Sequence, residues 1–446
     1  MLLAAAAAAL TLAACGGGDD KKSGAASTPA PPEATLDRGE FGEAVTVTSG
    51  PTHDADVTID RHTGRIYVSW AGDRPKPKGG TFTPQDAWVA FSDDGGKTFS
   101  KPVRANHDVG TVNAGFNAQT RIVSTGNNRV FTAWPLMNDD MSKMNAMGTL
   151  STDGGKTFAP EKPLSSGDGP GTTELYQALA TYGQNVYASY LDYRSDLEPS
   201  MPTGLNVVHS ADGGRTWSKS SRAEVSSCQC CDTALAADSN GALYFAYRNL
   251  DHATKNNQIR DSAVIRSYDN GHTWSDPVPL GDDNWVFNGC PEAGPEIAVD
   301  AEDNVHGVYW TGKEGRQGVY YTWSTDGGQT FAKPVGVAVA DFYPPAYMDL
   351  TVDKDGNAWI VWDDKRTKDR KVHLARAHDG EVEVLSDDLG SGVTPAVDSD
   401  GSLVAVSWSD AKGLHVITRG EAARDGFGSG PGEEDSGKDE EGHEGH

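Results

Sequence analysis

Seven short apolar runs, each ending in an aromatic residue, recur along the middle of the chain. They read IYVSW to Trp70, VFTAW to Trp134, VYASY to Tyr190, LYFAY to Tyr247, HGVY to Tyr309, AWIVW to Trp362 and VAVSW to Trp408. Runs of this length, rich in β-branched and aromatic residues and separated by turn residues, predict strands rather than helices. The pattern therefore predicts an all-β protein built from seven repeated sheets.

An eight-residue box follows most of these runs. It reads SDDGGKTF from Ser92, STDGGKTF from Ser151, SADGGRTW from Ser210, SYDNGHTW from Ser267 and STDGGQTF from Ser324. The nearly constant spacing of these boxes indicates one supersecondary unit used repeatedly. A worn sixth copy, AHDGE, occupies residues 377–381.

The boxes predict tight turns rather than catalytic sites. Aspartate accepts hydrogen bonds from turn amides, and glycine adopts backbone conformations that other residues penalise. We expect structural aspartates at Asp94, Asp153, Asp212, Asp269 and Asp326.

The seventh repeat stops after three strands, near residue 418. At the other end of the chain, the segment that begins at Phe41 resembles the sequences that follow the boxes. We expect residues 43–48 to supply the missing fourth strand, which would leave no sheet edge open. The prediction is a seven-bladed β-propeller over residues 41–420, closed by pairing of its N- and C-terminal strands.

The repeated Ser-x-Asp-x-Gly-x-Thr-Trp/Phe box resembles the Asp box of the sialidase-like (BNR) propellers. The resemblance implies the propeller fold, with a six-bladed sialidase propeller as the alternative to seven blades. It also implies binding of a ligand, a glycan above all, at the mouth of the propeller, and exo-sialidase-type glycoside hydrolysis if the protein is an enzyme. Because this fold also serves assembly and interaction scaffolds, that function stays open.

Sialidases that resemble this chain use three arginines, an aspartate as acid and base, and a tyrosine nucleophile assisted by a glutamate. The resemblance makes four residues the catalytic candidates: Tyr343, Glu292, Arg194 and Arg366. The family's Arg-Ile-Pro signature has no match in the first blade, where residues 53–57 read HDADV.

The loops after the aromatic runs and the crossings between blades are expected on one face, with the boxes on the other. Five repeats carry a cation four residues beyond the aromatic residue: Arg74, Arg194, Lys313, Arg366 and Lys412. These cations either bind an anionic group of a ligand or pair with nearby aspartates and order the loops. The ligand-binding candidates are Arg74, Lys313, Lys412, Glu296 and Tyr347.

Sulfur-containing residues gather on the same expected face. Four cysteines open blades four and five: Cys228, Cys230, Cys231 and Cys290. Four methionines lie in the loop of blade two, at a spacing unlike that of core packing: Met137, Met141, Met144 and Met147. Because such ligands favour copper or zinc, a soft-metal lipoprotein is an alternative function, and disulfides among the cysteines are the alternative to metal.

Both ends of the chain lack the repeat pattern. Residues 1–15, MLLAAAAAALTLAAC, resemble a bacterial lipoprotein signal, which implies a lipidated Cys15 and anchoring on the extracytoplasmic side of a membrane, in the periplasm or at the cell surface. Residues 16–40 have the composition of a flexible tether, and residues 421–446 predict a disordered, acidic, histidine-containing tail. The formal net charge of −26 disfavours nucleic acid as a partner.

Overall fold

The computed structural model of the chain describes residues 41–421, apart from 80–82, 116–117, 138–143, 169–173, 194–202, 255–256, 290, 340–344, 346, 365–369, 387–388 and 390–391. Among the described residues, no helix is long and apolar enough to cross a membrane. The predicted lipid site Cys15, the tether and residues 422–446 of the acidic tail lie outside the described residues.

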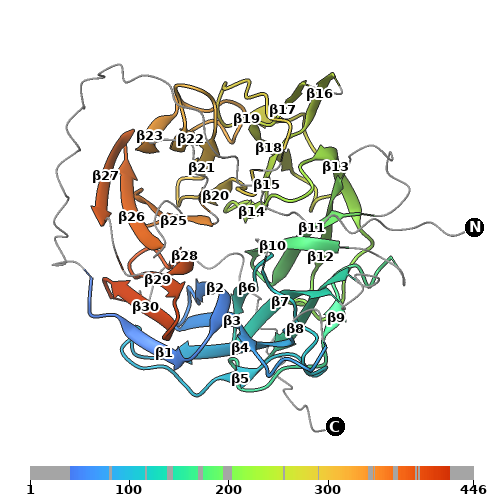
Figure 1. Cartoon of the computed structure of the whole chain (residues 1–446), viewed down its shortest axis with the longest axis vertical. Coiled ribbons are helices and arrows are strands. Elements are labelled where there is room, and N and C mark those ends of the chain that lie inside the picture. Colours follow the sequence, from blue (N-terminus) through green and yellow to red (C-terminus); the bar gives the residue numbers. More distant parts are fainter. Residues whose placement is uncertain are drawn as a thin grey trace, which may run out of the picture. The chain divides into compact units, whose positions relative to one another are not determined.

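Seven four-stranded antiparallel sheets form the blades of a propeller (Figure 1). Blade one contains β2 (Thr52–Ile59), β3 (Ile66–Asp73), β4 (Gln85–Ser92) and β5 (Val103–Arg104); blade two contains β6 (Arg121–Gly126), β7 (Arg129–Met137), β8 (Met144–Ser151) and β9 (Lys162–Pro163). Blade three contains β10 (Glu174–Tyr182), β11 (Asn185–Asp192), β12 (Thr203–Ser210) and β13 (Ser221–Ser227); blade four contains β14 (Ala234–Ala237), β15 (Leu243–Arg248), β18 (Ser262–Ser267) and β19 (Val278–Pro279).

The remaining blades repeat this order. Blade five contains β20 (Glu296–Val299), β21 (Val305–Thr311), β22 (Gly318–Ser324) and β23 (Val335–Val339); blade six contains β24 (Met348–Val352), β25 (Ala358–Asp364), β26 (Lys371–His378) and β27 (Glu381–Ser386). Blade seven contains β28 (Val393–Ser399), β29 (Val404–Ser409), β30 (Gly413–Arg419) and β1 (Val45–Ser49), and a hairpin of β16 (Asp251–Thr254) and β17 (Asn257–Ile259) is inserted in blade four. The seven-bladed prediction is confirmed, and the six-bladed alternative is wrong.

The ring closes through β1, as the sequence predicts. This strand comes from the N-terminal side of the propeller and pairs antiparallel with β30, with Val45 opposite Val416 and Ser49 opposite Gly413. Gly413 has a φ of 152°, and a Cβ atom there would lie 1.9 Å from the carbonyl oxygen of Thr48. Only glycine lets the two chain ends approach this closely.

The hydrophobic core lies between adjacent blades. The first strand of each blade contacts the first strand of the next, from β2 through β6, β10, β14, β20 and β24 to β28, and β28 contacts β2. The aromatic residues that end the seven predicted runs are all buried: Trp70, Trp134, Tyr190, Tyr247, Tyr309, Trp362 and Trp408. Burying a large apolar side chain stabilises a fold by about 1.5–3 kcal/mol, so the repeated run accounts for much of the cohesion between blades.

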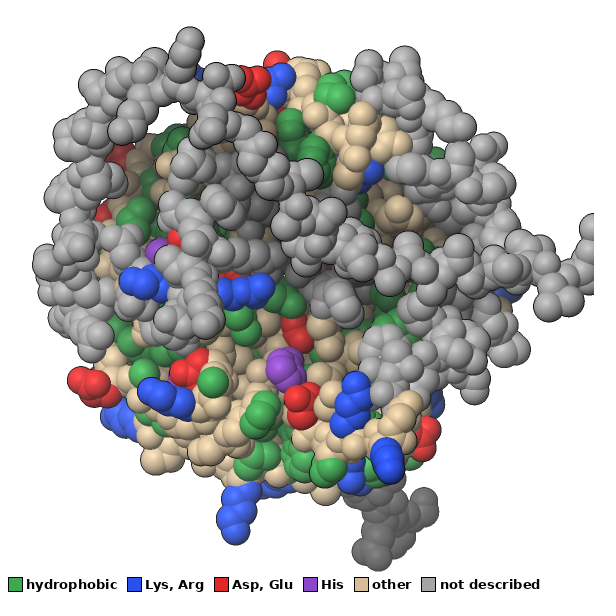
Figure 2. All heavy atoms as spheres, in the orientation of Figure 1, with side chains coloured by type: hydrophobic (Ala, Val, Ile, Leu, Met, Phe, Trp, Pro, Cys, Tyr) green, Lys and Arg blue, Asp and Glu red, His purple; other side chains and the backbone are tan. Residues whose placement is uncertain are grey.

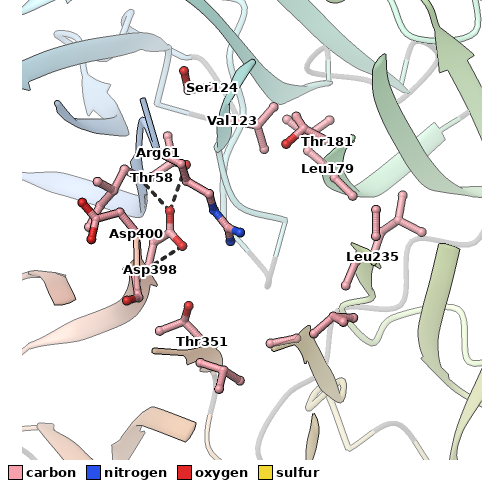
Figure 3. Close-up of a pocket in the computed structure, with 18 of the residues that line it drawn as sticks. Thr58, Arg61, Val123, Ser124, Leu179, Thr181, Leu235, Thr351, Asp398 and Asp400 are labelled. Atoms are coloured by element: carbon pink, nitrogen blue, oxygen red, sulfur yellow. Dashed lines mark hydrogen bonds between the residues drawn. The ribbon is translucent and has the colours of Figure 1, made fainter. Parts of the chain in front are cut away.

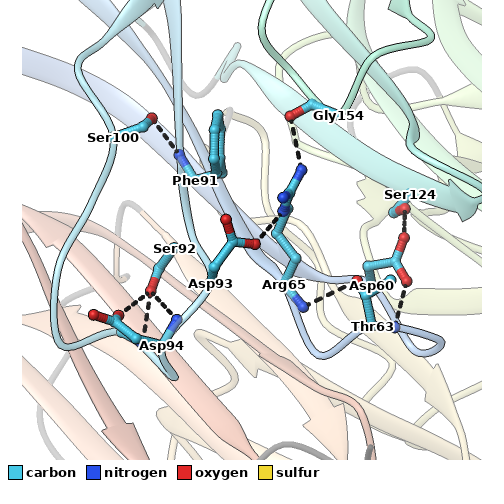
Figure 4. A network of polar contacts seen from close by, with 11 residues as sticks. Asp60, Thr63, Arg65, Phe91, Ser92, Asp93, Asp94, Ser100, Ser124 and Gly154 are labelled. Carbon is cyan, nitrogen blue, oxygen red and sulfur yellow. Dashed lines mark hydrogen bonds and ion pairs between the residues drawn. The ribbon is translucent and has the colours of Figure 1, made fainter.

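Each complete Asp box closes the turn between the third and fourth strands of a blade. In blade one, Thr98 donates from its backbone N–H and hydroxyl to Asp94, at 2.9 and 2.6 Å, and the Ser92 hydroxyl donates to Asp94 at 2.8 Å. The same hydrogen bonds recur around Asp153, Asp212, Asp269 and Asp326. These are the contacts of a turn staple, and Figure 4 shows the serine and aspartate of blade one.

The boxes also connect neighbouring blades. Arg65, in the turn before β3, donates to Asp93 of the blade-one box at 2.6 Å and to the carbonyl oxygen of Gly154 in the blade-two box at 3.2 Å (Figure 4). The worn sixth box lacks the serine and threonine, and Asp379 and Gly380, with φ values of 49° and 79°, instead make a two-residue hairpin turn between β26 and β27.

Candidate functional site

An axial cavity of about 590 Å³ runs along the first strands of the blades. Its wall mixes aliphatic side chains such as Leu179 and Leu235 with the hydroxyl groups of Ser124 and Thr351, and Arg61 extends into it (Figure 3). The lining includes the turns that follow the first strands, with residues such as His62 and Lys354, so the cavity extends toward the Asp-box side and not toward the face on which the sequence predicts the ligand. Its inner end lies near the beginnings of these strands. A cavity of this size and mixed lining suits a small polar ligand.

Arg121 lies at the centre of the charged group that closes this end of the cavity. Its Nη2 atom is 2.7 Å from Oδ2 of Asp232 and 4.0 Å from Oε1 of Glu296. All three side chains are buried, and Arg121 and Glu296 line the cavity together with Asp56 and Asp349. Four carboxyl groups from blades one, four, five and six therefore surround a single guanidinium.

Burial dominates the ionisation of these carboxyl groups. It raises the pKa of Asp56 to about 6 and that of Asp349 to about 7, although Arg121 lowers both. The pKa of Glu296 rises well above its ordinary value for the same reason, with further contributions from Asp349 and Asp232. Burial thus favours the protonated form of Glu296, beside two carboxyl groups with pKa values of about 6 and about 7.

Two of these carboxylates, and a third from blade seven, also connect the blades. Asp56 accepts the backbone N–H of Ile122 in blade two, Asp349 accepts that of Val397 in blade seven, and Asp398 accepts that of Ile59 in blade one. An inner strand exposes backbone donors on its axial edge, and these donors need acceptors when they are buried. Asp56 and Asp349 therefore have a structural role alongside any chemistry.

A second buried pair lies beside the group around Arg121. The Tyr347 hydroxyl donates a hydrogen bond to Oδ1 of Asp54, and both side chains are buried. Burial raises the pKa of Asp54 to about 6 and that of Tyr347 well above its ordinary value. Tyr347, predicted to bind ligand, therefore stands as a neutral phenol paired with a carboxyl group.

The described cations of the predicted ring do not gather around a common ligand site. Arg74 pairs with Asp86 at 2.6 Å, which is the local loop-ordering arrangement. Lys412 is exposed and Lys313 is partly exposed, and neither lines the axial cavity. Arg194 and Arg366 lie outside the described residues. On the face shown in Figure 2, basic and acidic side chains are interspersed over the described surface rather than gathered in one patch.

The glutamates predicted for blade five separate in the structure. Glu296 begins β20 and lines the cavity, whereas Glu292 is exposed and does not line it. Tyr343, the proposed nucleophile, lies outside the described residues. Among the described residues proposed for catalysis or ligand binding, Glu296 alone lines the cavity.

The cysteines divide into two kinds. Cys230 is disulfide-bonded, while Cys228 and Cys231 are buried, reduced thiols. Cys290 lies outside the described residues. A disulfide-bonded Cys230 has no thiolate to give to a metal, so the expected shell of four thiolates is not the arrangement found. The described part of the chain contains no group of three or more His, Cys, Asp or Glu side chains placed to hold a metal ion.

The methionines do not act as one group either. Met147 is 9% exposed and packs in a core cluster with Trp134, so the expectation that these methionines lie outside the core is wrong for this residue. Its position opposite Trp134 in the β7–β8 ladder explains the burial. Met137 and Met144 pair at the end of the same hairpin, and Met141 lies outside the described residues.

Sequence reasoning missed Arg121, Asp56, Asp232 and Asp349. A periodic signal was present, because Arg121, Gln177, Glu296 and Asp349 each stand thirteen residues before the aromatic residue of their repeat. Aligning the repeats on their aromatic residues would have placed these polar groups in the first half of the inner strand in four of the seven repeats. The convergence of those strands at the axis is what brings the side chains together.

Residues 123–286 match the family model described as a BNR repeat-like domain. With the seven blades and the five Asp boxes, this match over part of the chain supports a sialidase-like BNR β-propeller. A search of curated proteins finds no match.

Solved structures of three enzymes that act on carbohydrates are similar to this chain. An ulvan lyase from a new family of polysaccharide lyases has 12% identity over 85% of this chain and 96% of its own, with a TM-score of 0.54. An α-L-arabinofuranosidase from Fusarium graminearum has 14% identity over 85% and 98%, with a TM-score of 0.50. A Hadza microbial sialidase has 16% identity over 80% and 76%, with a TM-score of 0.45. The first two likenesses show a shared propeller fold.

Proposed function

We propose that the protein binds an uncharged saccharide in the axial cavity and hydrolyses a glycosidic bond there. Glu296 carries this proposal, because its buried carboxyl group lines the cavity beside Arg121 and burial raises its pKa, which favours the protonated form. Glycoside hydrolysis needs one carboxyl group that donates a proton to the leaving oxygen and a second that acts as base or nucleophile. Glu296 takes the first role, and Asp349, with a pKa of about 7, takes the second.

The charge of the site favours an uncharged sugar over a sialic acid. Sialate binding relies on several arginines around one carboxylate, but the arginines among the described lining residues are Arg61 and Arg121. Arg61 follows the end of β2, whereas Arg121 begins β6 and is already paired with Asp232. The carboxyl groups around Arg121 accept hydrogen bonds from sugar hydroxyls and repel a second anion.

The test uses the full chain with 4-nitrophenyl glycosides of neutral sugars, compared with the sialic acid glycoside. We expect hydrolysis of a neutral glycoside, and we expect Glu296→Gln to lower kcat by about 10²–10⁴-fold while saccharide binding persists. The matched control is Glu383→Gln, which changes an exposed glutamate paired with Arg376. Hydrolysis confined to the sialoside, or an E296Q variant as active as wild type, would overturn the proposal.

We also propose that Cys15 anchors the protein by a lipid on the extracytoplasmic side of a membrane. The sequence LTLAAC before the tether supports this placement, and so does the disulfide at Cys230, since disulfides persist in oxidising compartments. Cys15→Ser should move the protein from the membrane fraction to the soluble fraction. A C15S variant that stays with the membrane would contradict a lipid anchor at this residue.

A further inference from the structure

Two thiols meet beneath the crossing segment that opens blade four. Cys228 and Cys231 are each 1% exposed, and their sulfur atoms lie 3.1 Å apart, with the Cys231 thiol donating to the Cys228 sulfur. The two residues between them keep this spacing, and one of these, Cys230, is already held in a disulfide. The pair therefore sits at a contact distance from which a bond between the sulfurs needs only a small movement.

A guanidinium makes the two sulfurs unequal. Arg260 Nη1 lies 3.0 Å from the sulfur of Cys228, and the same side chain is fixed by Oε1 of Gln258 at 2.8 Å and by the carbonyl oxygen of Phe287 at 2.9 Å. The hydrogen bond from Cys231 and the charge of Arg260 lower the pKa of Cys228, whereas burial raises the pKa of Cys231. Cys228 is thus the thiolate, and Cys231 keeps its proton.

We propose that Cys228 and Cys231 form a redox-active dithiol that reduces a small hydroperoxide and is converted to a disulfide. The Cys228 thiolate attacks one peroxide oxygen, the O–O bond breaks, and the leaving oxygen takes up a proton as water or an alcohol. The Cys231 sulfur then attacks the sulfenic sulfur, the S–O bond breaks, and the hydroxide leaves as water with the proton of Cys231. One peroxide is reduced and two thiols are oxidised, so atoms and electrons balance.

The burial of the pair selects the class of oxidant. Exchange with a protein disulfide requires three sulfur atoms in line at an accessible site, and both described sulfurs are almost fully buried. A hydroperoxide brings only two oxygen atoms to the thiolate, and Arg260 stands where it can polarise the O–O bond. This dithiol is separate from the axial cavity, so the inference does not depend on the glycan proposal.

The test treats the full folded chain with hydrogen peroxide at pH 7, then denatures it, alkylates remaining thiols and maps the peptides. We expect Cys228 and Cys231 to escape alkylation together in the wild type, and we expect a dimedone-reactive sulfenic acid at Cys228 in Cys231→Ser. Arg260→Gln should slow the reaction about tenfold or more, because a return of the Cys228 pKa from about 6 toward the ordinary value of about 8.5 leaves only a few per cent of thiolate at pH 7. The matched control, Arg376→Gln, should react like the wild type.

Two results would overturn the inference. In one, both thiols of peroxide-treated wild type remain available for alkylation. In the other, R260Q reacts at the wild-type rate. If a variant fails to fold, the pH dependence of the wild-type reaction decides the question, because a rate that rises only near the ordinary thiol pKa of about 8.5 contradicts the thiolate assignment.

Discussion

The Asp boxes and the axial site use the same chemical group in two different environments. Asp326, in a box turn, is exposed, and hydrogen bonds from Thr330 lower its pKa to about 2. Asp349, on the axis, also accepts two backbone N–H groups, yet burial raises its pKa to about 7. Hydrogen bonding alone does not decide the charge of a carboxyl group in this protein, because desolvation at the axis outweighs it.

The difference separates the roles of the two regions. A box aspartate is ionised at neutral pH and serves the turn, which agrees with its lack of any contact with the cavity. An axial carboxyl group titrates near neutral pH and lies beside a guanidinium, which suits proton transfer. The following four variants test this contrast, beginning with the largest expected effect.

Replacing Arg121 with methionine should cost the most stability. Asp232 would lose its buried cation, and breaking such a pair costs about 3–5 kcal/mol in the free energy of unfolding. The loss should be smaller at pH 5, where the carboxyl groups take up protons. Denaturant titrations at pH 7 and pH 5 measure this loss of stability. The control Arg376→Met breaks an exposed ion pair and should cost less than about 1 kcal/mol. Equal losses in the two variants would contradict the importance of the axial pair.

Replacing Asp349 with asparagine should change how stability depends on pH. The folded pKa of Asp349 is about 7 against an ordinary value of 3.8, so the folded protein holds a proton that the unfolded chain releases. The stability from this group is complete below about pH 4 and is lost as the pH rises through 7, by up to about 1.4 kcal/mol per pH unit. The D349N variant should therefore lose less stability than wild type over that range.

The matched control for this measurement is Asp355→Asn, which changes an exposed aspartate paired with Lys354. Its stability curve should run parallel to that of the wild type between pH 4 and 7. If the D349N curve is also parallel, Asp349 does not bind a proton on folding.

Replacing Asp326 with alanine should lower the free energy of unfolding moderately. The contribution of Asp326 should depend on pH in the opposite direction to that of Asp349. The turn loses the acceptor for Thr330 and Ser324, which costs about 1–2 kcal/mol at neutral pH. Because the pKa of Asp326 is lowered, this contribution is present above about pH 4 and disappears as the pH falls toward 2. Thermal unfolding at pH 7 and pH 2 measures both parts, with Asp276→Ala as the exposed control. A loss that persists unchanged at pH 2 would argue against the staple.

Replacing Asp379 with asparagine should have the smallest effect. The worn box has no serine or threonine to bind, and asparagine tolerates the φ of 49° at this position. The free energy of unfolding should stay within about 0.5 kcal/mol of wild type. A loss as large as that of D326A would mean that the sixth turn depends on its aspartate as the complete boxes do.

Much of the fold could be predicted because its signals are local and repeated. A strand that ends in Trp70 and a turn stapled by Asp94 are each specified within a few residues, and the period multiplies the signal. Closure by residues 43–48 was also predictable, because their sequence echoes that of other fourth strands. The structure places this strand at Val45–Ser49.

The axial site could not be predicted in the same way. Arg121 and Asp232 are 111 residues apart and belong to blades two and four, so their side chains meet at the propeller axis past the inner strand of blade three. Nothing near Arg121 in the sequence marks it as buried, since an arginine before a strand is more often exposed. The cations four residues beyond each aromatic residue had a regular spacing, yet Arg74 pairs with Asp86 within its own blade.

The closure of the ring has a consequence for how the protein is made. The strand β1, which is the fourth strand of blade seven, leaves the ribosome before any blade is complete. Its partner β30 follows more than 360 residues later. The first six blades can each assemble from neighbouring sequence as the chain grows, but the seventh must wait for the last strand. Such long-range pairing is slow, so the early strand needs to stay unpaired until the end of synthesis.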